Sequence, residues 1–215
     1  MSTTPSPDAP ATLDGRRQGG ERTRRRLVEA AQELIAERGE SAVRLRELTE
    51  LAGANMAAVN YHFGSLGALL VAATMEAVER IIDAQVGEVD GLPAEASLHD
   101  IAAAYFRPMI EALNGPSSKG RAYVRVLART TTDPPPELRN WVHAATSRAH
   151  DALLGRLRSA LPGVPDDELA FRVRCVGGIL VLLSTVAWEP DLQGKTVTEV
   201  ERMLVPVIAG ALAAA

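Results

Sequence analysis

The sequence predicts an all-α protein of about nine helices, with an amino-terminal three-helix helix-turn-helix domain and a larger helical domain after it. Hydrophobic residues make up 47% of the 215 residues and aromatic residues only 4%, so Ala, Leu and Val must form most of the core. Such a core suits helices better than sheets. Apolar residues also recur at helical spacing in runs such as VEAAQELIAE and GGILVLLSTVA, and no segment predicts a strand or an internal repeat.

Four helices are predicted in the first part of the chain, after a tail. Residues 1–20 begin with a run rich in Pro, Ser, Thr and Asp, which predicts a disordered tail rather than a secretory signal. The predicted helices span residues 23–38, 45–52, 56–63 and 65–86. Gly39 and Gly53 end the first two, while Asn55 and Ser65 can cap the last two.

Five further helices are predicted in the rest of the chain, separated by loops rich in Gly and Pro. They span residues 98–113, 121–131, 137–161, 166–188 and 196–213. Pro108 is expected to kink or split the first of them, and Pro206 to bend the last.

Charge and cysteine content restrict the classes of function. The net charge of −4 argues against a generally basic nucleic-acid-binding coat, but six arginines crowd residues 16–26. This cluster predicts either a solvated face or contacts to phosphates. The single cysteine, Cys175, rules out an intrachain disulfide and is expected to be a buried, inert thiol. Because the longest apolar stretch, 175–188, is too short to span a bilayer, we expect a cytoplasmic protein without membrane contact.

The stretch LRELTELAGANMAAVNYHF carries the most information. Two short helices joined by a turn containing Gly form the helix-turn-helix pattern, and Gly53 tolerates the positive φ that such a turn needs. Small or medium apolar residues at Leu48, Ala52 and Val59 would line the crossing of the two helices. By itself the pattern also fits an ordinary helix pair without a DNA-binding role.

The surrounding sequence resembles the amino-terminal DNA-binding domain of the tetracycline-repressor (TetR) family of transcriptional regulators. The similarity runs through RTRRRLVEAAQELIAERGESAVRLRELTELAGANMAAVNYHFGSLGALLVAA. It implies a DNA-binding domain at 21–64 and a helical effector-binding and dimerisation domain at 65–215. Leu66 departs from the family pattern, in which a lysine that contacts phosphate often occupies this position, and Thr49 stands where Ala is usual.

The third helix is expected to enter the major groove. With Asn55 as its cap, Met56, Ala57 and Ala58 would lie deepest and contact thymine methyl groups, and Asn60 could pair with adenine. The resemblance implies phosphate contacts from Tyr61 and His62. The flanking arginines expected to reach the backbone are Arg22, Arg24, Arg25, Arg44 and Arg46. Asn60 facing solvent, and Tyr61 or His62 serving as a core side chain, remain the alternatives; Phe63 is expected in the core.

The two last helices are too apolar for a monomer surface, so we expect a four-helix dimer interface; an intramolecular core is the alternative. The predicted interface residues are Val176, Ile179, Leu180, Leu183, Val200, Leu204, Val207 and Ile208. The middle helices would enclose an effector pocket, although large side chains at helical spacing more often form plain core. The candidates are Phe106, Met109, Ile110, Tyr123, Leu127, Trp141 and His143.

Together these features predict a homodimeric repressor that a mostly apolar small-molecule effector releases from a palindromic operator in double-stranded DNA. No cofactor, metal site or catalytic residue is expected. Gly194-Lys195-Thr196 resembles the end of a phosphate-binding loop, but Glu189 stands where that loop needs Gly. The alternatives are an all-α dimeric interaction module without specific DNA binding and, less favoured, a small helical enzyme.

Overall fold

The computed structural model describes residues 13–114, 118–132, 134, 136, 138–183 and 194–214. Within these ranges the chain forms nine α-helices and one short 3-10 helix and has no strand, which confirms the predicted all-α fold. The elements are α1 (Leu13–Arg38), η1 (Glu40–Ala42), α2 (Leu45–Leu51), α3 (Met56–Phe63), α4 (Leu66–Asp90), α5 (Leu98–Asn114), α6 (Ser118–Thr132), α7 (Arg139–Ala160), α8 (Asp166–Leu183) and α10 (Val197–Ala213).

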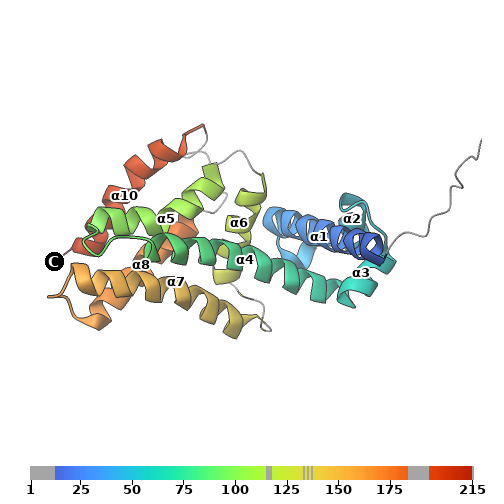
Figure 1. Ribbon diagram of the computed structural model, residues 1–215, viewed down its shortest axis with the longest axis horizontal. Coiled ribbons are helices and arrows are strands. Elements are labelled where there is room, and N and C mark those ends of the chain that lie inside the picture. The colour runs from blue at the N-terminus through green and yellow to red at the C-terminus, as the bar shows by residue number, and fades with distance from the viewer. Residues whose placement is uncertain are drawn as a thin grey trace, which may run out of the picture.

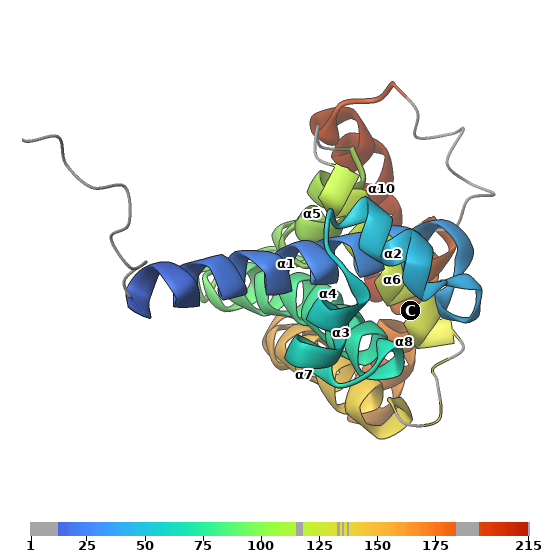
Figure 2. The ribbon, with the colours of Figure 1, turned by 90° about the vertical axis from the view of Figure 1, so that its right-hand side faces the viewer.

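The molecule is elongated, with α4 running along its length (Figure 1). Helices α1, α2 and α3 gather at one end, and α5, α7, α8 and α10 at the other, with α6 between them. Figure 2 views the molecule from the end that carries the first three helices. None of the described helices is long and apolar enough to cross a membrane.

The start of α1 corrects one prediction. This helix begins at Leu13, well before the expected residue 23, so the predicted disordered tail is wrong for residues 13–20; residues 1–12 lie outside the described part of the chain. Extending a helix adds a hydrogen bond for each residue without a new nucleation cost, which outweighs the weak propensity of the glycines in this segment. The end of the helix predicted at 166–188 also lies partly outside the described residues, which stop at Leu183.

Pro108 and Pro206 lie inside α5 and α10, and both helices continue through them. Pro108 therefore does not split its helix, which was one of the two outcomes expected for it. It is buried in the core, where packing of the surrounding side chains offsets the lost main-chain hydrogen bond.

Two hydrophobic clusters form the core of the described residues, and α4 belongs to both. Leu69, Leu70, Ala73 and Ala77 of α4 join the amino-terminal cluster formed with α1, α2 and α3. The second half of α4, from Val78 onward, packs into the larger cluster with α5, α7, α8 and α10. Helix α4 is therefore a continuous rod between the two parts of the molecule.

Helix α6 also joins the two clusters. Its residues Ala122 and Val126 are buried in the amino-terminal cluster, whereas Val124 and Leu127 are buried in the larger one. Tyr123 packs against both clusters. The predicted boundary after residue 64 thus marks a change of helix, but the packing on either side of it is continuous.

Candidate DNA-binding surface and ligand cavity

Helix α3 is positioned by signals within its own few residues. The Asn55 side-chain oxygen accepts a 2.9 Å hydrogen bond from the Ala58 main-chain nitrogen and so caps the helix start. Gly53, with φ of 57°, forms the turn from α2, and Gly64, with φ of 79°, ends α3. Val59 points inward and is fully buried against the amino-terminal cluster.

The opposite face of α3 is open to solvent. Met56 is 58% exposed and Tyr61 84% exposed, and Ala57 and Asn60 are exposed as well. Tyr61 is therefore no core aromatic, which removes that alternative. Ala58 is half-buried beside the cap. An uncharged helix face of small and amide side chains is free to approach base edges.

His62 and Phe63 attach the end of α3 to α1. Phe63 is partly buried against the amino-terminal cluster, as expected, and the Arg24 guanidinium lies 5.4 Å from the centre of its ring. His62 is half-buried, and a Cβ placed on Gly20 would lie 3.7 Å from its Cε1. Only part of the imidazole thus remains available for a phosphate.

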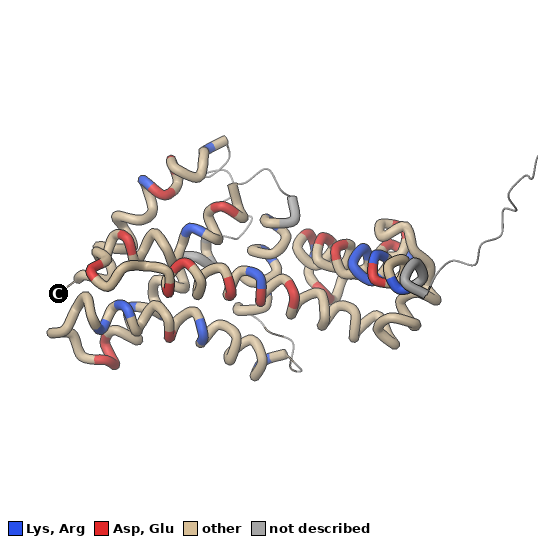
Figure 3. Tube along the Cα trace, viewed as in Figure 1, with Lys and Arg blue, Asp and Glu red and all other residues tan. Residues whose placement is uncertain are grey.

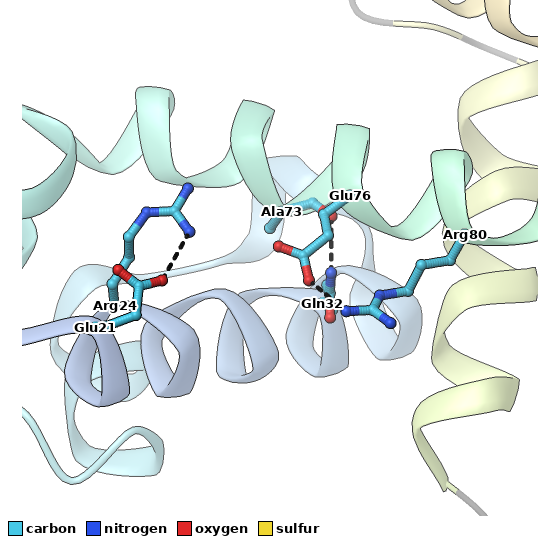
Figure 4. A network of polar contacts seen from close by, with 6 residues as sticks. All are labelled: Glu21, Arg24, Gln32, Ala73, Glu76 and Arg80. Atoms are coloured by element: carbon cyan, nitrogen blue, oxygen red, sulfur yellow. Dashed lines mark hydrogen bonds and ion pairs between the residues drawn. The ribbon is translucent and has the colours of Figure 1, made fainter. Parts of the chain in front are cut away.

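The candidate arginines surround α3 on two helices. Figure 3 shows Lys and Arg in blue on the part of α1 that lies at the α2–α3 end of the molecule, with acidic residues farther along the helix. Arg22 and Arg25 are exposed there. The Arg24 guanidinium lies 3.9 Å from a carboxylate oxygen of Glu21. Figure 4 shows this ion pair. These cations can reach phosphates on either side of a bound helix.

Arg44 and Arg46 lie at the start of α2, and neighbouring groups orient both. The Arg44 guanidinium donates a 2.9 Å hydrogen bond to the Ser41 carbonyl oxygen. Arg46 donates a 2.9 Å hydrogen bond to Glu50, and this bond raises the pKa of Arg46. Both side chains remain exposed and permanently charged, so they can exchange these contacts for phosphate oxygens.

The two departures from the family pattern have structural explanations. Leu66 is half-buried and packs against the amino-terminal cluster, while Ser65 caps α4 by accepting a 3.1 Å hydrogen bond from the Ala68 nitrogen. Position 66 thus supports the core that holds α3. Thr49 is buried, and its hydroxyl donates to the Arg46 carbonyl oxygen of the preceding turn at 2.9 Å.

A cavity of about 250 Å³ lies among α4, α5, α6, α7 and α8. Its lining residues are Ile82, Gln85, Tyr105, Met109, Leu127, Ala128, Thr131, Thr146, His150, Arg174, Gly177 and Gly178. The predicted pocket residues Met109 and Leu127 are among them. The other predicted residues are not.

The structure places those five side chains elsewhere. Phe106 and Ile110 are buried in the larger cluster, Tyr123 and Trp141 pack partly buried against hydrophobic residues, and His143 is exposed. Helical spacing identified large side chains but not the face of each helix that the neighbouring helices would leave uncovered. These five predicted residues therefore do not line this cavity.

Polar groups in the cavity wall are held in place. The Gln85 side-chain nitrogen donates to the Tyr105 carbonyl oxygen at 3.0 Å and lies 3.6 Å from the Met109 sulfur. Burial lowers the pKa of His150, and Arg174 and His143 lower it further, while Asp151 acts in the opposite direction. The His150 imidazole is therefore neutral near pH 7.

The predicted dimer interface needs correction. Three of its residues, Val176, Val200 and Ile208, are buried in the chain's own core, as the intramolecular alternative expects. Ile179 and Leu204 pack partly buried against the same cluster, and the side chains of Leu180 and Leu183 lie outside the described residues. Of the predicted set, Val207 alone is an exposed side chain in the part of the chain that the structure describes.

A different apolar stripe faces solvent on α8 and α10. On α8 it comprises Phe171, Cys175, Gly178 and Leu182, spaced by three or four residues; on α10 it comprises Met203 and Val207. The expectation of a buried thiol is therefore wrong, since Cys175 is exposed in the single chain. The sequence predicted the two apolar helices but not which face the core would use.

A capped helix-turn-helix with an exposed, uncharged reading face and flanking arginines, joined to a helical domain, defines a DNA-binding transcriptional regulator. Residues 27–73 match the family model for bacterial regulatory proteins of the tetR family, and residues 103–213 match the tetracyclin repressor-like C-terminal domain. The chain belongs to the TetR family. Members of this family are DNA-binding regulators rather than enzymes, which agrees with the expected lack of catalysis.

Solved structures share the fold over most of their length. The TetR family regulator PfmR from Thermus thermophilus is 19% identical, with a TM-score of 0.64 over 87% of this chain and 94% of that one. A transcriptional regulator from Saccharomonospora viridis, in complex with choline, is 24% identical, with a TM-score of 0.63 over 87% and 96%.

NalD of Pseudomonas aeruginosa, the secondary repressor of the MexAB-OprM multidrug efflux pump, is 17% identical, with a TM-score of 0.61 over 89% of this chain and 95% of that one. A comparison with curated proteins found no match.

Proposed function

We propose that the protein is a homodimeric repressor whose affinity for a palindromic operator falls when a small molecule occupies the cavity. The observation that carries the DNA-binding part is the exposed face of α3, on which Met56, Ala57, Asn60 and Tyr61 stand free of the core. Such a face can read bases while the nearby arginines contact phosphates. Because this partner is chromosomal DNA, we expect the protein to act in the cytoplasm.

Dimerisation would give the DNA contact its spacing. The exposed stripe on α8 and α10, from Phe171 to Leu182 and at Met203 and Val207, supports an interface between two copies of this chain. A twofold dimer would place two copies of α3 about 34 Å apart, so that each reads one half-site in successive major grooves. A change in the spacing of the two α3 helices is the simplest way in which the dimer would dissociate from its operator.

The packing of α4 and α6 supports a structural connection between the cavity and the DNA-binding helices. Helix α4 lines the cavity with Ile82 and Gln85, and its first turns hold the amino-terminal cluster through Leu69 and Ala73. Helix α6 does the same, since Leu127 lines the cavity and Val126 is buried beside α1. A ligand that favours one placement of these two helices would shift the population of DNA-binding conformations.

Choline, the ligand of the Saccharomonospora viridis protein, fits this cavity poorly. Quaternary ammonium ions bind among several aromatic faces. Among the described lining residues Tyr105 is the sole aromatic, and Arg174 would repel the cation. We therefore expect a different effector here.

Footprinting and electrophoretic mobility shift on the region upstream of the protein's own gene, together with selection of sites from random DNA, test this function. We expect protection of a palindrome with half-sites about one helical turn apart. Binding without sequence preference at both low and moderate salt, in both assays, would refute the proposal.

A further inference from the structure

The described residues that line the cavity carry positive but no negative charge. Among the described residues that line it, Arg174 is the only one with a full charge at neutral pH, and no Asp or Glu contributes. His150 adds a neutral imidazole, because its pKa is lowered, and Thr131 and Thr146 add hydroxyl groups. An anionic group is therefore the charged ligand group that this wall complements.

The cation and the apolar wall lie at different depths. Arg174 and Thr131 are exposed and mark the mouth of the cavity. Ile82, Met109 and Leu127 are buried and form its interior. A ligand that fits has an acidic head at the mouth and an apolar body inside.

The size of the cavity and its single cation restrict the class of ligand further. A volume of about 250 Å³ lies below the range of roughly 300–1,000 Å³ usual for drug-sized ligands. One guanidinium matches a carboxylate with two parallel hydrogen bonds, whereas a doubly charged phosphate would leave charge uncompensated. Gly177 gives His150 its room, since a Cβ there would lie 3.3 Å from the imidazole Nε2.

We propose that the effector is a small amphipathic monocarboxylate whose head binds Arg174 at the cavity mouth and whose apolar part lies against Ile82, Met109 and Leu127. This inference rests on the proposed function, because it names the ligand class of a ligand-responsive regulator. It refines the expectation of a mostly apolar effector by giving that molecule one negative charge.

Isothermal titration calorimetry with the full chain tests the proposal. The probes are hexanoate and hydrocinnamate, with the alcohols and amines of the same carbon skeletons. We expect at least one carboxylate to bind about tenfold more tightly than its alcohol, as for a partly solvated charge-assisted hydrogen bond, and the amine to bind weakest. An alcohol or amine that binds as tightly as its carboxylate would overturn the proposal, as would failure of both carboxylates to bind.

Three variants locate the effect. Arg174→Gln should reduce carboxylate affinity about tenfold and leave alcohol affinity unchanged. Arg202→Gln, which alters an exposed arginine on α10 that does not line the cavity, should change neither affinity. Gly177→Ala should weaken both ligands, because its methyl group crowds His150. Unchanged carboxylate affinity in Arg174→Gln would overturn the assignment of the head group.

Mobility shifts with the ligand-free protein separate this inference from the proposed function. Specific DNA binding together with no preference for carboxylates overturns only the ligand class. Carboxylate binding without specific DNA binding overturns the regulatory function and, with it, the description of the ligand as an effector.

Discussion

The side-chain nitrogen of Gln32 donates a 3.0 Å hydrogen bond to the main-chain carbonyl oxygen of Ala73, within the buried amino-terminal cluster (Figure 4). Gln32 is only 2% exposed. The bond ties α1 directly to α4, the helix that continues to the ligand cavity. It is directional, whereas the surrounding apolar contacts are not.

Removing this bond should lower stability. Gln32→Ala loses the hydrogen bond and leaves a small cavity, so we expect the free energy of unfolding to fall by about 1–3 kcal/mol in chemical denaturation. Gln32→Met keeps the volume but replaces the amide by a group that cannot donate, and should lose less. Unchanged stability in Gln32→Met would show that the hydrogen bond contributes nothing beyond filling space, whereas equal losses in the two variants would assign the whole effect to the hydrogen bond.

Asn60 should determine one base preference. Asn60→Ala is expected to cost about 1–3 kcal/mol of discrimination at one position of each half-site, because we expect its amide to pair with adenine through two hydrogen bonds. Competition mobility shifts with single-base operator variants measure this. Asn140→Ala provides the matched control, since Asn140 is exposed on α7, away from α3. A uniform loss over all operator variants would instead assign Asn60 to the DNA backbone.

Val207 should hold two copies of the chain together. This side chain is 60% exposed on α10, and Val207→Glu would place a charge in the apolar stripe. We expect a monomer of about 23 kDa by light scattering after size exclusion, with helix content retained. Leu51→Glu, at a 49% exposed position on α2, should remain a dimer. If the Val207→Glu protein is still a dimer, the interface lies elsewhere on the molecule.

His150 should make stability depend on pH. Its folded pKa lies below the ordinary value of about 6.5, chiefly through burial, so the unfolded chain binds the proton more readily. The free energy of unfolding should therefore be constant above about pH 7 and decline as pH falls through 6.5 toward the folded pKa. The decline is the cost of charging a largely buried imidazole, which Arg174 and His143 increase and Asp151 partly offsets.

His150→Gln tests this assignment. Denaturation midpoints from pH 5 to pH 8 should decline less on acidification in the variant than in the parent protein. Asn140→Ala, which alters an exposed, uncharged side chain of α7 outside the cavity lining, is the control and should follow the parent curve. An identical slope in His150→Gln and the parent would assign the acid sensitivity to other groups.

The helix-turn-helix could be predicted because its signals are local. The cap at Asn55, the positive φ at Gly53 and the inward Val59 all lie within one short stretch, so their geometry follows from neighbouring residues. The contribution of Leu66 to the amino-terminal cluster could not be predicted from its neighbouring residues. Its burial depends on how α4 meets α1, and the sequence alone offered only a missing lysine.

The cavity and the exposed apolar stripe depend on contacts between distant helices. From periodicity, Phe106 and Met109 are equally good candidates for the cavity wall, since both lie on the same helix. Packing buries Phe106 in the core and leaves Met109 at the cavity wall. Arg174 and His150 gave no sequence signal as a pair, since they come from α8 and α7. Their proximity arises only when these helices pack side by side.

The sequence by itself determined the helices, the helix-turn-helix and its family, because hydrogen bonds and capping act over a few residues. The tertiary structure decided which faces those helices bury. It turned Val176 and Ile208 inward and left Phe171 and Val207 outside, because α8 and α10 each bury one face in the cluster that they form with α4, α5, α6 and α7.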